Sequence, residues 1–166
     1  MVKRFVIVLI WSVFFLQSAF AETQKLAVLE FRGGVDQAYL LNLSDQTRSA
    51  AVQSLSKEEY LIFTRENMMQ ILDDMGKDAS CIEGSCEVEI GRSIGADILI
   101  TGDVLSVNGV YILNLKLYET KTGRLLATQE VQNEDLLKLM KMSLLMFQSL
   151  ICSDCKINSF SPSFKL

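Results

Sequence analysis

The stretch TRENMMQILDDMGKDASCIEGSCEVEIGRSIGADILITGDV, residues 64–104, decides the fold expected for this chain. Thr64 supplies the N-cap of a helix, and Gly76 ends it, since glycine takes the left-handed conformation cheaply. A short cysteine loop follows, and Ser85 is the expected cap of a second helix that ends at Gly95. The run from Asp97 to Val107 then predicts a strand with apolar residues on both faces, typical of a central strand covered on both sides.

The sequence before this stretch predicts two more strands with a helix between them. Lys25 to Phe31 is a short apolar run that leads into a turn at Gly33-Gly34. Ser44 is the expected N-cap of a helix that reaches about Leu55, and Tyr60 to Phe63 is the next strand. Because Gly33 lies beside a second glycine in a turn, we expect a larger residue at Gly95 to be more damaging than one at Gly33.

The sequence after it predicts an antiparallel meander. Asn108-Gly109 is a strong type I′ hairpin signal, and the returning strand alternates apolar and polar residues from Tyr111 to Leu117. A turn from Thr120 to Gly123 leads into a third strand that carries Leu125, Ala127 and Val131. The expected fold is therefore α/β (α+β): a mixed sheet of about five strands with an antiparallel C-terminal meander, covered by about four helices.

A last helix is expected over residues 134–151, and it is apolar on more than one face. One interpretation is a core helix packed on the sheet, with methionines as gap fillers. The other is a helix that also meets a partner, because side chains on its outer face would be left exposed. The residues expected to share that outer face, as a possible partner-binding helix, are Leu137, Met140, Leu144 and Phe147.

The first 21 residues have the pattern of a secretory signal peptide. Lys3 and Arg4 precede an apolar run, and Ala19-Phe20-Ala21 is an A-x-A cleavage site. The apolar run is shorter than the roughly 20 residues of a spanning helix, so no stable membrane span is expected after cleavage. We expect a single domain over residues 22–151 and an irregular tail over residues 152–166.

Charge and composition restrict the partners. Cleavage would remove Lys3 and Arg4 and leave 14 basic and 20 acidic residues, a net charge of −6. No cluster of cations is present that could follow a phosphate backbone, so neither nucleic acid nor anionic lipid is expected as the main partner. The chain contains no histidine, which removes Ser/His/Asp and Cys/His catalysis.

Four cysteines form two closely spaced pairs. Cys81 and Cys86 enclose a flexible four-residue loop and are expected to form a disulfide in an oxidising compartment. Cys152 and Cys155 form a C-x-x-C pair, a possible second disulfide, at a helix C-terminus rather than at the N-terminus that a redox-active pair needs. Zinc binding would need all four cysteines as ligands. Export into an oxidising compartment argues against four free thiols, so no metal is expected.

Paired carboxylates are present but favour a structural role. The pairs are Asp73-Asp74, Glu87/Glu89 and Asp97/Asp103. Glu87 and Glu89 lie in the first turns of a helix, where the macrodipole accounts for them, and Asp97 is expected to bond local backbone N–H groups. No glycine-rich phosphate loop is present, and no catalytic residue or cofactor is predicted.

Several segments together resemble a family of bacterial envelope domains. They are LAVLEFRGG, LSDQTRSA, TRENM, CIEGSCEVEIGRSIGADILITGDV and LKLYETKTGRLLAT, which span about residues 26–131. The family includes the amino-terminal domain of the Tol–Pal propeller protein TolB, the curli secretion channel subunit and lipoprotein activators of penicillin-binding proteins. The resemblance implies a periplasmic domain that binds protein partners or assembles envelope machinery, without catalytic residues.

The sequence therefore predicts an exported, non-enzymatic protein-interaction or assembly module of the cell envelope, which binds envelope proteins or itself. One alternative is a thiol–disulfide exchange protein that uses Cys152 and Cys155. Another is a truncated, non-functional remnant of a larger exported protein, because related chains usually continue into another domain whereas this one ends in ICSDCKINSFSPSFKL.

Overall fold

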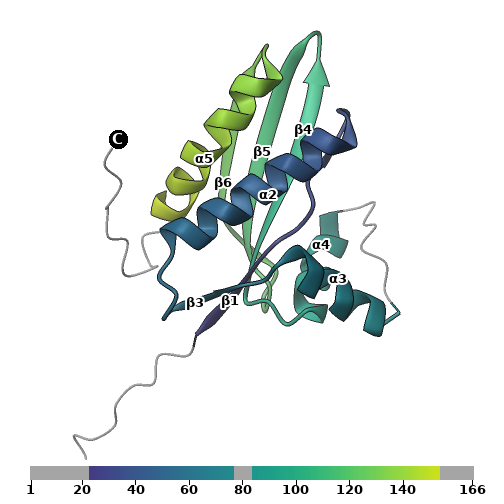
Figure 1. Ribbon diagram of the computed structural model, residues 1–166, viewed down its shortest axis with the longest axis vertical. Helices are drawn as coiled ribbons and strands as arrows, with labels where there is room; N and C mark the ends of the chain where they lie inside the picture. Colours follow the sequence, from purple (N-terminus) through teal and green to yellow (C-terminus); the bar gives the residue numbers. More distant parts are fainter. Residues whose placement is uncertain (1–22, 77–83, 154–166) are drawn as a thin grey trace, which may run out of the picture.

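A computed structural model describes residues 23–76 and 84–153. These residues form one mixed sheet with helices on both faces (Figure 1), which confirms the expected fold class. The sheet has six strands in the order β3-β1-β4-β5-β6, and β2 pairs separately with β4. In chain order the elements are β1 Gln24–Val28, β2 Arg32–Gly33, α2 Gln37–Ser54, β3 Tyr60–Ile62, α3 Arg65–Asp74, α4 Gly84–Ser93, β4 Ile98–Val107, β5 Val110–Glu119, β6 Arg124–Asn133 and α5 Leu136–Ser153.

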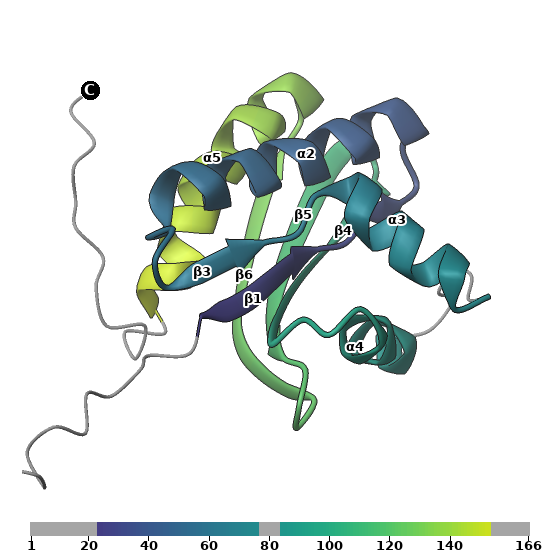
Figure 2. The ribbon, with the colours of Figure 1, turned by 60° about the horizontal axis from the view of Figure 1, so that its bottom comes forward.

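Two hydrophobic clusters lie on opposite faces of the sheet. Helices α2 and α5 cover one face, and α3 and α4 lie against the other (Figure 2). Leu26 and Val28 of β1 belong to the first cluster, whereas Ala27 between them belongs to the second. A strand whose successive side chains are buried on both faces is central, and β1 is flanked by β3 and β4 in parallel.

Strand β4 is covered on both faces only in its first half. Ile98 and Ile100 are buried under α2 and α5, and Leu99 is buried in the cluster formed with α3 and α4. Towards the end of the strand, Leu105 and Val107 are exposed. The expectation of a strand buried on both faces throughout is therefore wrong for this end, because α3 and α4 do not reach it (Figure 1).

The C-terminal meander has the expected geometry. Asn108 and Gly109 both have positive φ angles, 51° and 82°, as a type I′ turn requires. Strand β5 buries its odd-numbered leucines completely, and β6 pairs with it through a bulge at Leu117/Tyr118. The fully buried leucines of β5 are Leu113, Leu115 and Leu117.

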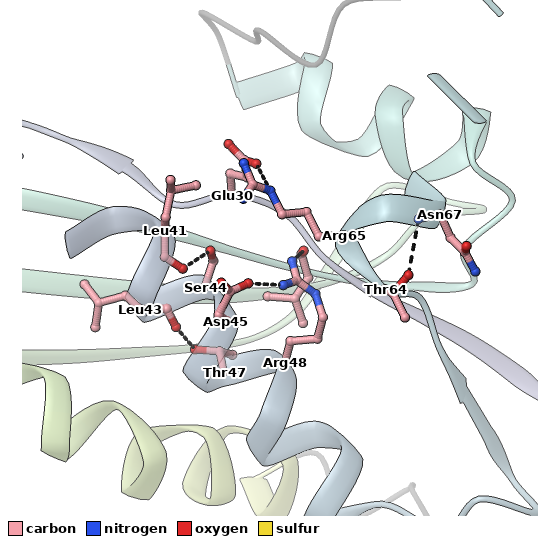
Figure 3. A network of polar contacts seen from close by, with 11 residues as sticks. Glu30, Leu41, Leu43, Ser44, Asp45, Thr47, Arg48, Thr64, Arg65 and Asn67 are labelled. Carbon is pink, nitrogen blue, oxygen red and sulfur yellow. Dashed lines mark hydrogen bonds and ion pairs between the residues drawn. The ribbon is translucent and has the colours of Figure 1, made fainter. Parts of the chain in front are cut away.

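Helix α2 begins a full two turns earlier than predicted. Its N-cap is Asp36, whose carboxylate accepts the Ala38 N–H at 2.8 Å. Ser44 lies inside the helix and donates its hydroxyl to the Leu41 carbonyl oxygen at 2.8 Å (Figure 3). The prediction that Ser44 is the N-cap is therefore wrong, because the helix has already begun at Gln37. A serine can lie inside a helix when its hydroxyl bonds to a carbonyl of the preceding turn.

The caps in the decisive stretch are confirmed at three of four positions. Thr64 accepts the Asn67 N–H at 3.2 Å (Figure 3). Gly76 and Gly95 both adopt left-handed conformations, with φ of 63° and 72°. Helix α4 begins at Gly84 and not after Ser85, so Ser85 lies within the helix.

Candidate functional site

Four charged side chains from four different elements meet at the edge of α4. Arg32 of β2 donates through Nη2 to Glu87 of α4, and also to Oδ1 of Asp103 on β4 at 3.1 Å. Lys116 of β5 donates through Nζ to Oδ2 of the same Asp103 at 2.7 Å. We call Arg32, Glu87, Asp103 and Lys116 the ionic cluster; it has no net charge and ties three strands to α4.

Glu87 is the most buried member of the ionic cluster. Its side chain is 3% exposed, and its Oε2 has no hydrogen-bond partner among the described residues. A buried carboxylate is costly to desolvate unless it is paired, so Arg32 is the group that makes the burial of Glu87 tolerable. Sequence reasoning missed this role, because the position of Glu87 in a first helical turn already gave it an explanation.

Two side chains of β5, Lys116 of the ionic cluster and its neighbour Tyr118, have raised pKa values. The hydrogen bond to Asp103 raises the pKa of Lys116 above its usual range, although partial burial acts in the opposite direction. Burial raises the pKa of Tyr118, which lies next to Lys116 on the same face, and the lysine charge opposes this shift. Both Lys116 and Tyr118 therefore hold their protons at neutral pH.

Beyond the ionic cluster, the end of the sheet face that α3 and α4 cover elsewhere is left without a helix among the described residues (Figure 1). Leu105 and Val107 of β4 lie on this face opposite Ile112 and Val110 of β5. We call these four residues the apolar tip. Leu105 and Val107 are each about half exposed. Exposed aliphatic residues beside a charged cluster are typical of a surface that contacts a protein.

The structure separates the carboxylate pairs noted in the sequence. Asp103 belongs to the ionic cluster. The carboxylate of Asp97 accepts the backbone N–H of Lys25 on β1 at 2.8 Å. The expected bond to a backbone N–H is present, but its donor is 72 residues away and not local, and it helps to position β1. Glu89 is exposed, unlike Glu87. Among the described residues, no group of three or more histidine, cysteine or acidic side chains is arranged to hold a metal ion.

Only part of the two cysteine pairs falls on described residues. Cys86 lies in the first turn of α4, partly buried against the cluster that contains Leu99. Cys152 lies in the last turn of α5. Cys81 and Cys155 lie outside the described residues, so the bridges from Cys81 to Cys86 and from Cys152 to Cys155 remain predictions.

The predicted outer face of α5 is not a single exposed face. Phe147 is fully buried, and Met140 packs against the core, whereas Leu137 is 61% exposed. The side chain of Leu144 lies outside the described set. Among the described side chains of α5, Leu145 is also strongly exposed, at 67%. Phe147 therefore belongs to the core, and the participation of α5 in binding remains a prediction that rests on Leu137 and Leu145.

Comparison with solved structures shows the same fold in proteins of low sequence identity. Lipoprotein GNA1162 from Neisseria meningitidis aligns with a TM-score of 0.52 and 12% identity, over 81% of this chain and 99% of that one. The C-terminal domain of LpoB from Salmonella enterica aligns with a TM-score of 0.51 and 13% identity, over 75% and 92%. The Escherichia coli LpoB domain gives 0.50 and 15%, over 74% and 90%.

These similarities establish the fold alone. No protein-family model matches the chain, and no curated protein matches it in sequence. The shared fold with GNA1162, a lipoprotein by name, agrees with the expected fold relationship to lipoproteins, while the resemblance to the curli secretion subunit rests on sequence segments only. No helix within residues 23–76 and 84–153 has the length and apolar character needed to cross a membrane.

Proposed function

We propose that this chain is an exported, non-catalytic protein-interaction or assembly module of the bacterial envelope, acting in the periplasm. The observation that carries the proposal is the uncovered sheet face, where the apolar tip adjoins the ionic cluster. Aliphatic side chains that leave water on binding supply affinity, and a charged border supplies specificity. The fold shared with GNA1162, a lipoprotein, and with LpoB supports an envelope role.

The same geometry gives no support to catalysis. Glu87 and Asp103 of the ionic cluster form ion pairs with Arg32, and Asp103 also pairs with Lys116. Histidine is absent from the sequence. Thiol–disulfide exchange through Cys152 is not favoured, because its place in the last turn of α5 puts it at the negative end of the helix dipole. An insulin-reduction assay separates that alternative from binding.

The proposal is tested by comparing two valines of equal exposure. Val107 on the apolar tip is 49% exposed, and Val52 on the outer side of α2 is 47% exposed. Tagged wild-type, Val107→Asp and Val52→Asp proteins are expressed in a bacterial envelope, cross-linked and purified, and the captured proteins are identified by mass spectrometry. We expect a specific envelope protein with wild type and Val52→Asp that is lost with Val107→Asp.

Identical captured proteins from all three chains would contradict a binding role for the apolar tip. Circular dichroism on each variant shows whether a loss of capture reflects unfolding. Because both substitutions place one aspartate on a half-exposed surface position, they add the same charge and differ in location only.

A further inference from the structure

The sheet face that carries α3 and α4 continues beyond these helices along β5 and β6, and within the part of the chain that the structure describes it stays open there. Thr128 and Glu130 of β6 are exposed, whereas Val131 packs against the cluster under α2 and α5. Both exposed residues pair with even-numbered residues of β5, the side on which Tyr118 packs against the cluster of α3 and α4. We call this surface the open face; it comprises the apolar tip, Asn114, Lys116 and Tyr118 of β5, and Leu125, Thr128 and Glu130 of β6.

Apolar side chains lie at both ends of the open face. The apolar tip forms one end. At the other end, Leu125 lies opposite Tyr118 and is 48% exposed. Between the two ends the strands carry polar residues, and Glu130 lies opposite Asn114. A partner that covers the whole face therefore needs two apolar contacts with a polar contact between them.

Glu130 is the charge in this polar middle that is left for a partner. Lys116 lies diagonally across from Glu130 on β5, but its Nζ is held at 2.7 Å by Asp103 on the strand at its other side. Glu130 is exposed and forms no ion pair with any described residue. When a partner displaces water from a carboxylate, a cation on that partner compensates the lost hydration.

We propose that the open face binds an amphipathic helix of a partner protein, with apolar residues on the apolar tip and Leu125 and a lysine or arginine at Glu130. The inference rests on the proposed function, because it names the partner of the same surface. The backbone groups of β5 in the middle of the face already pair with β4 and β6, so an added strand would find no ladder there. Helices cover the rest of this sheet on both faces, and a further helix would extend the same layer.

The strand register predicts the spacing of the contacts on that helix. Asn114, opposite Glu130, lies two residues from Ile112 of the apolar tip and four residues from Tyr118. These separations correspond to about 7 Å and about 13 Å along the strand. Because a helix rises ~1.5 Å per residue, the basic residue should lie about four residues from one apolar contact and about nine from the other.

Selection from a displayed library of linear 18-residue peptides tests the chemistry of the partner. The full chain, purified as the cell processes it, is immobilised, and clones are kept when they bind wild type but not Val107→Asp. We expect the clones to carry apolar residues at helical spacing, with lysine or arginine one turn from an apolar position. The same selection against Glu130→Lys should favour aspartate or glutamate at that position.

A charge exchange with one selected peptide measures the pair directly. Glu130→Lys should weaken binding of the basic peptide about tenfold or more, and replacement of the peptide's basic residue by glutamate should do the same to wild type. Combining the two changes should restore most of the affinity. Glu58→Lys is the matched control, since Glu58 is exposed before β3 at the opposite edge of the sheet and its change alters the charge equally.

Several results would overturn the inference. Clones that depend on Val107 but show the same charge preference against wild type and Glu130→Lys would leave the apolar tip as a binding site and exclude the pairing with Glu130. Apolar residues that alternate with a period of two, or a bound peptide without a helical circular dichroism signal, would exclude a helix. The absence of any clone that depends on Val107 would also overturn it, while capture from the envelope would still decide the proposed function.

Sedimentation velocity tests whether a second copy is the occupant instead. Wild type is expected to show no dimer that Val107→Asp dissociates, and such a dimer would mean that the open face meets another copy of the chain. Melting curves for Val107→Asp, Glu130→Lys and Glu58→Lys separate lost binding from unfolding. Recovered affinity in the charge exchange cannot arise from an unfolded variant.

Discussion

At the scale of single residues, the structure reverses the expected order of sensitivity to substitution at Gly33 and Gly95. A Cβ atom added to Gly33 would lie 1.9 Å from the Val104 carbonyl oxygen, because β2 runs directly beside β4. A Cβ atom added to Gly95 would meet nothing within 4 Å, although its φ of 72° is left-handed. The expectation that Gly95 is the more sensitive position is therefore wrong on steric grounds.

We predict that Gly33→Ala destabilises the protein more than Gly95→Ala. The second change should cost about 1–2 kcal/mol, the strain of a left-handed alanine. The first adds a clash with backbone that only a displacement of β2 from β4 can relieve. Urea unfolding of both variants measures the two free energies, and a smaller loss for Gly33→Ala would show that β2 is not held against β4.

At the scale of elements, α5 has one buried stripe and one exposed flank. Leu139, Ser143, Phe147 and Leu150 follow the helical repeat and are all fully buried, whereas Leu145 is among the most exposed apolar residues. The sequence could not distinguish these faces, because leucine, methionine and phenylalanine occur all round the helix. The position of α2 beside α5 decides which side is covered.

We predict that Phe147→Ala costs about 3–5 kcal/mol, the usual loss for a buried phenylalanine replaced by alanine. Leu145→Ala should change the free energy of unfolding of the monomer by no more than about 0.5 kcal/mol, as exposed positions do. Chemical denaturation at low protein concentration, where any dimer is dissociated, provides the comparison. Equal losses at the two positions would show that the assigned faces of α5 are incorrect.

Sequence reasoning succeeded where short-range rules determine the structure. The Thr64 cap, the left-handed Gly76 and the turn at Asn108-Gly109 depend on residues close in the chain, and all three are confirmed. It failed where distant segments meet. The short pairing of β2 with β4 and the ion pair between Arg32 and Glu87 join residues far apart in sequence, and no local pattern indicates them.

At the scale of the whole molecule, Lys116 and Tyr118 make the folded protein less stable at alkaline pH. Lys116 and Tyr118 both have pKa values above their usual 10.5 and 10.0. The folded chain therefore holds these two protons more tightly than the unfolded chain. Their contribution to stability is fully present below about pH 10 and is lost as the pH rises through the folded-state pKa values.

We predict that the melting temperature of the wild type falls more steeply above about pH 10 than that of a Lys116→Met/Tyr118→Phe double variant. Lys121→Met is the control, because Lys121 is exposed in the turn before β6. Thermal melts followed by circular dichroism at several pH values give the slopes. Parallel slopes for wild type and double variant would mean that these groups titrate alike in the folded and unfolded chain.

The place of β1 in the sheet also determines the order in which the protein can assemble as the chain emerges from its N-terminus. The backbone N–H of Lys25 bonds to Asp97, 72 residues later in the chain, and β1 has β4 as its neighbour. The meander from β4 to β6, in contrast, needs only adjacent hairpins, which close quickly. A chain that emerges N-terminus first therefore carries β1 with only β3 as an available neighbour until the residues of β4 have emerged. Insertion of β1 between β3 and β4 is the step at which a holding chaperone would protect this chain from aggregation.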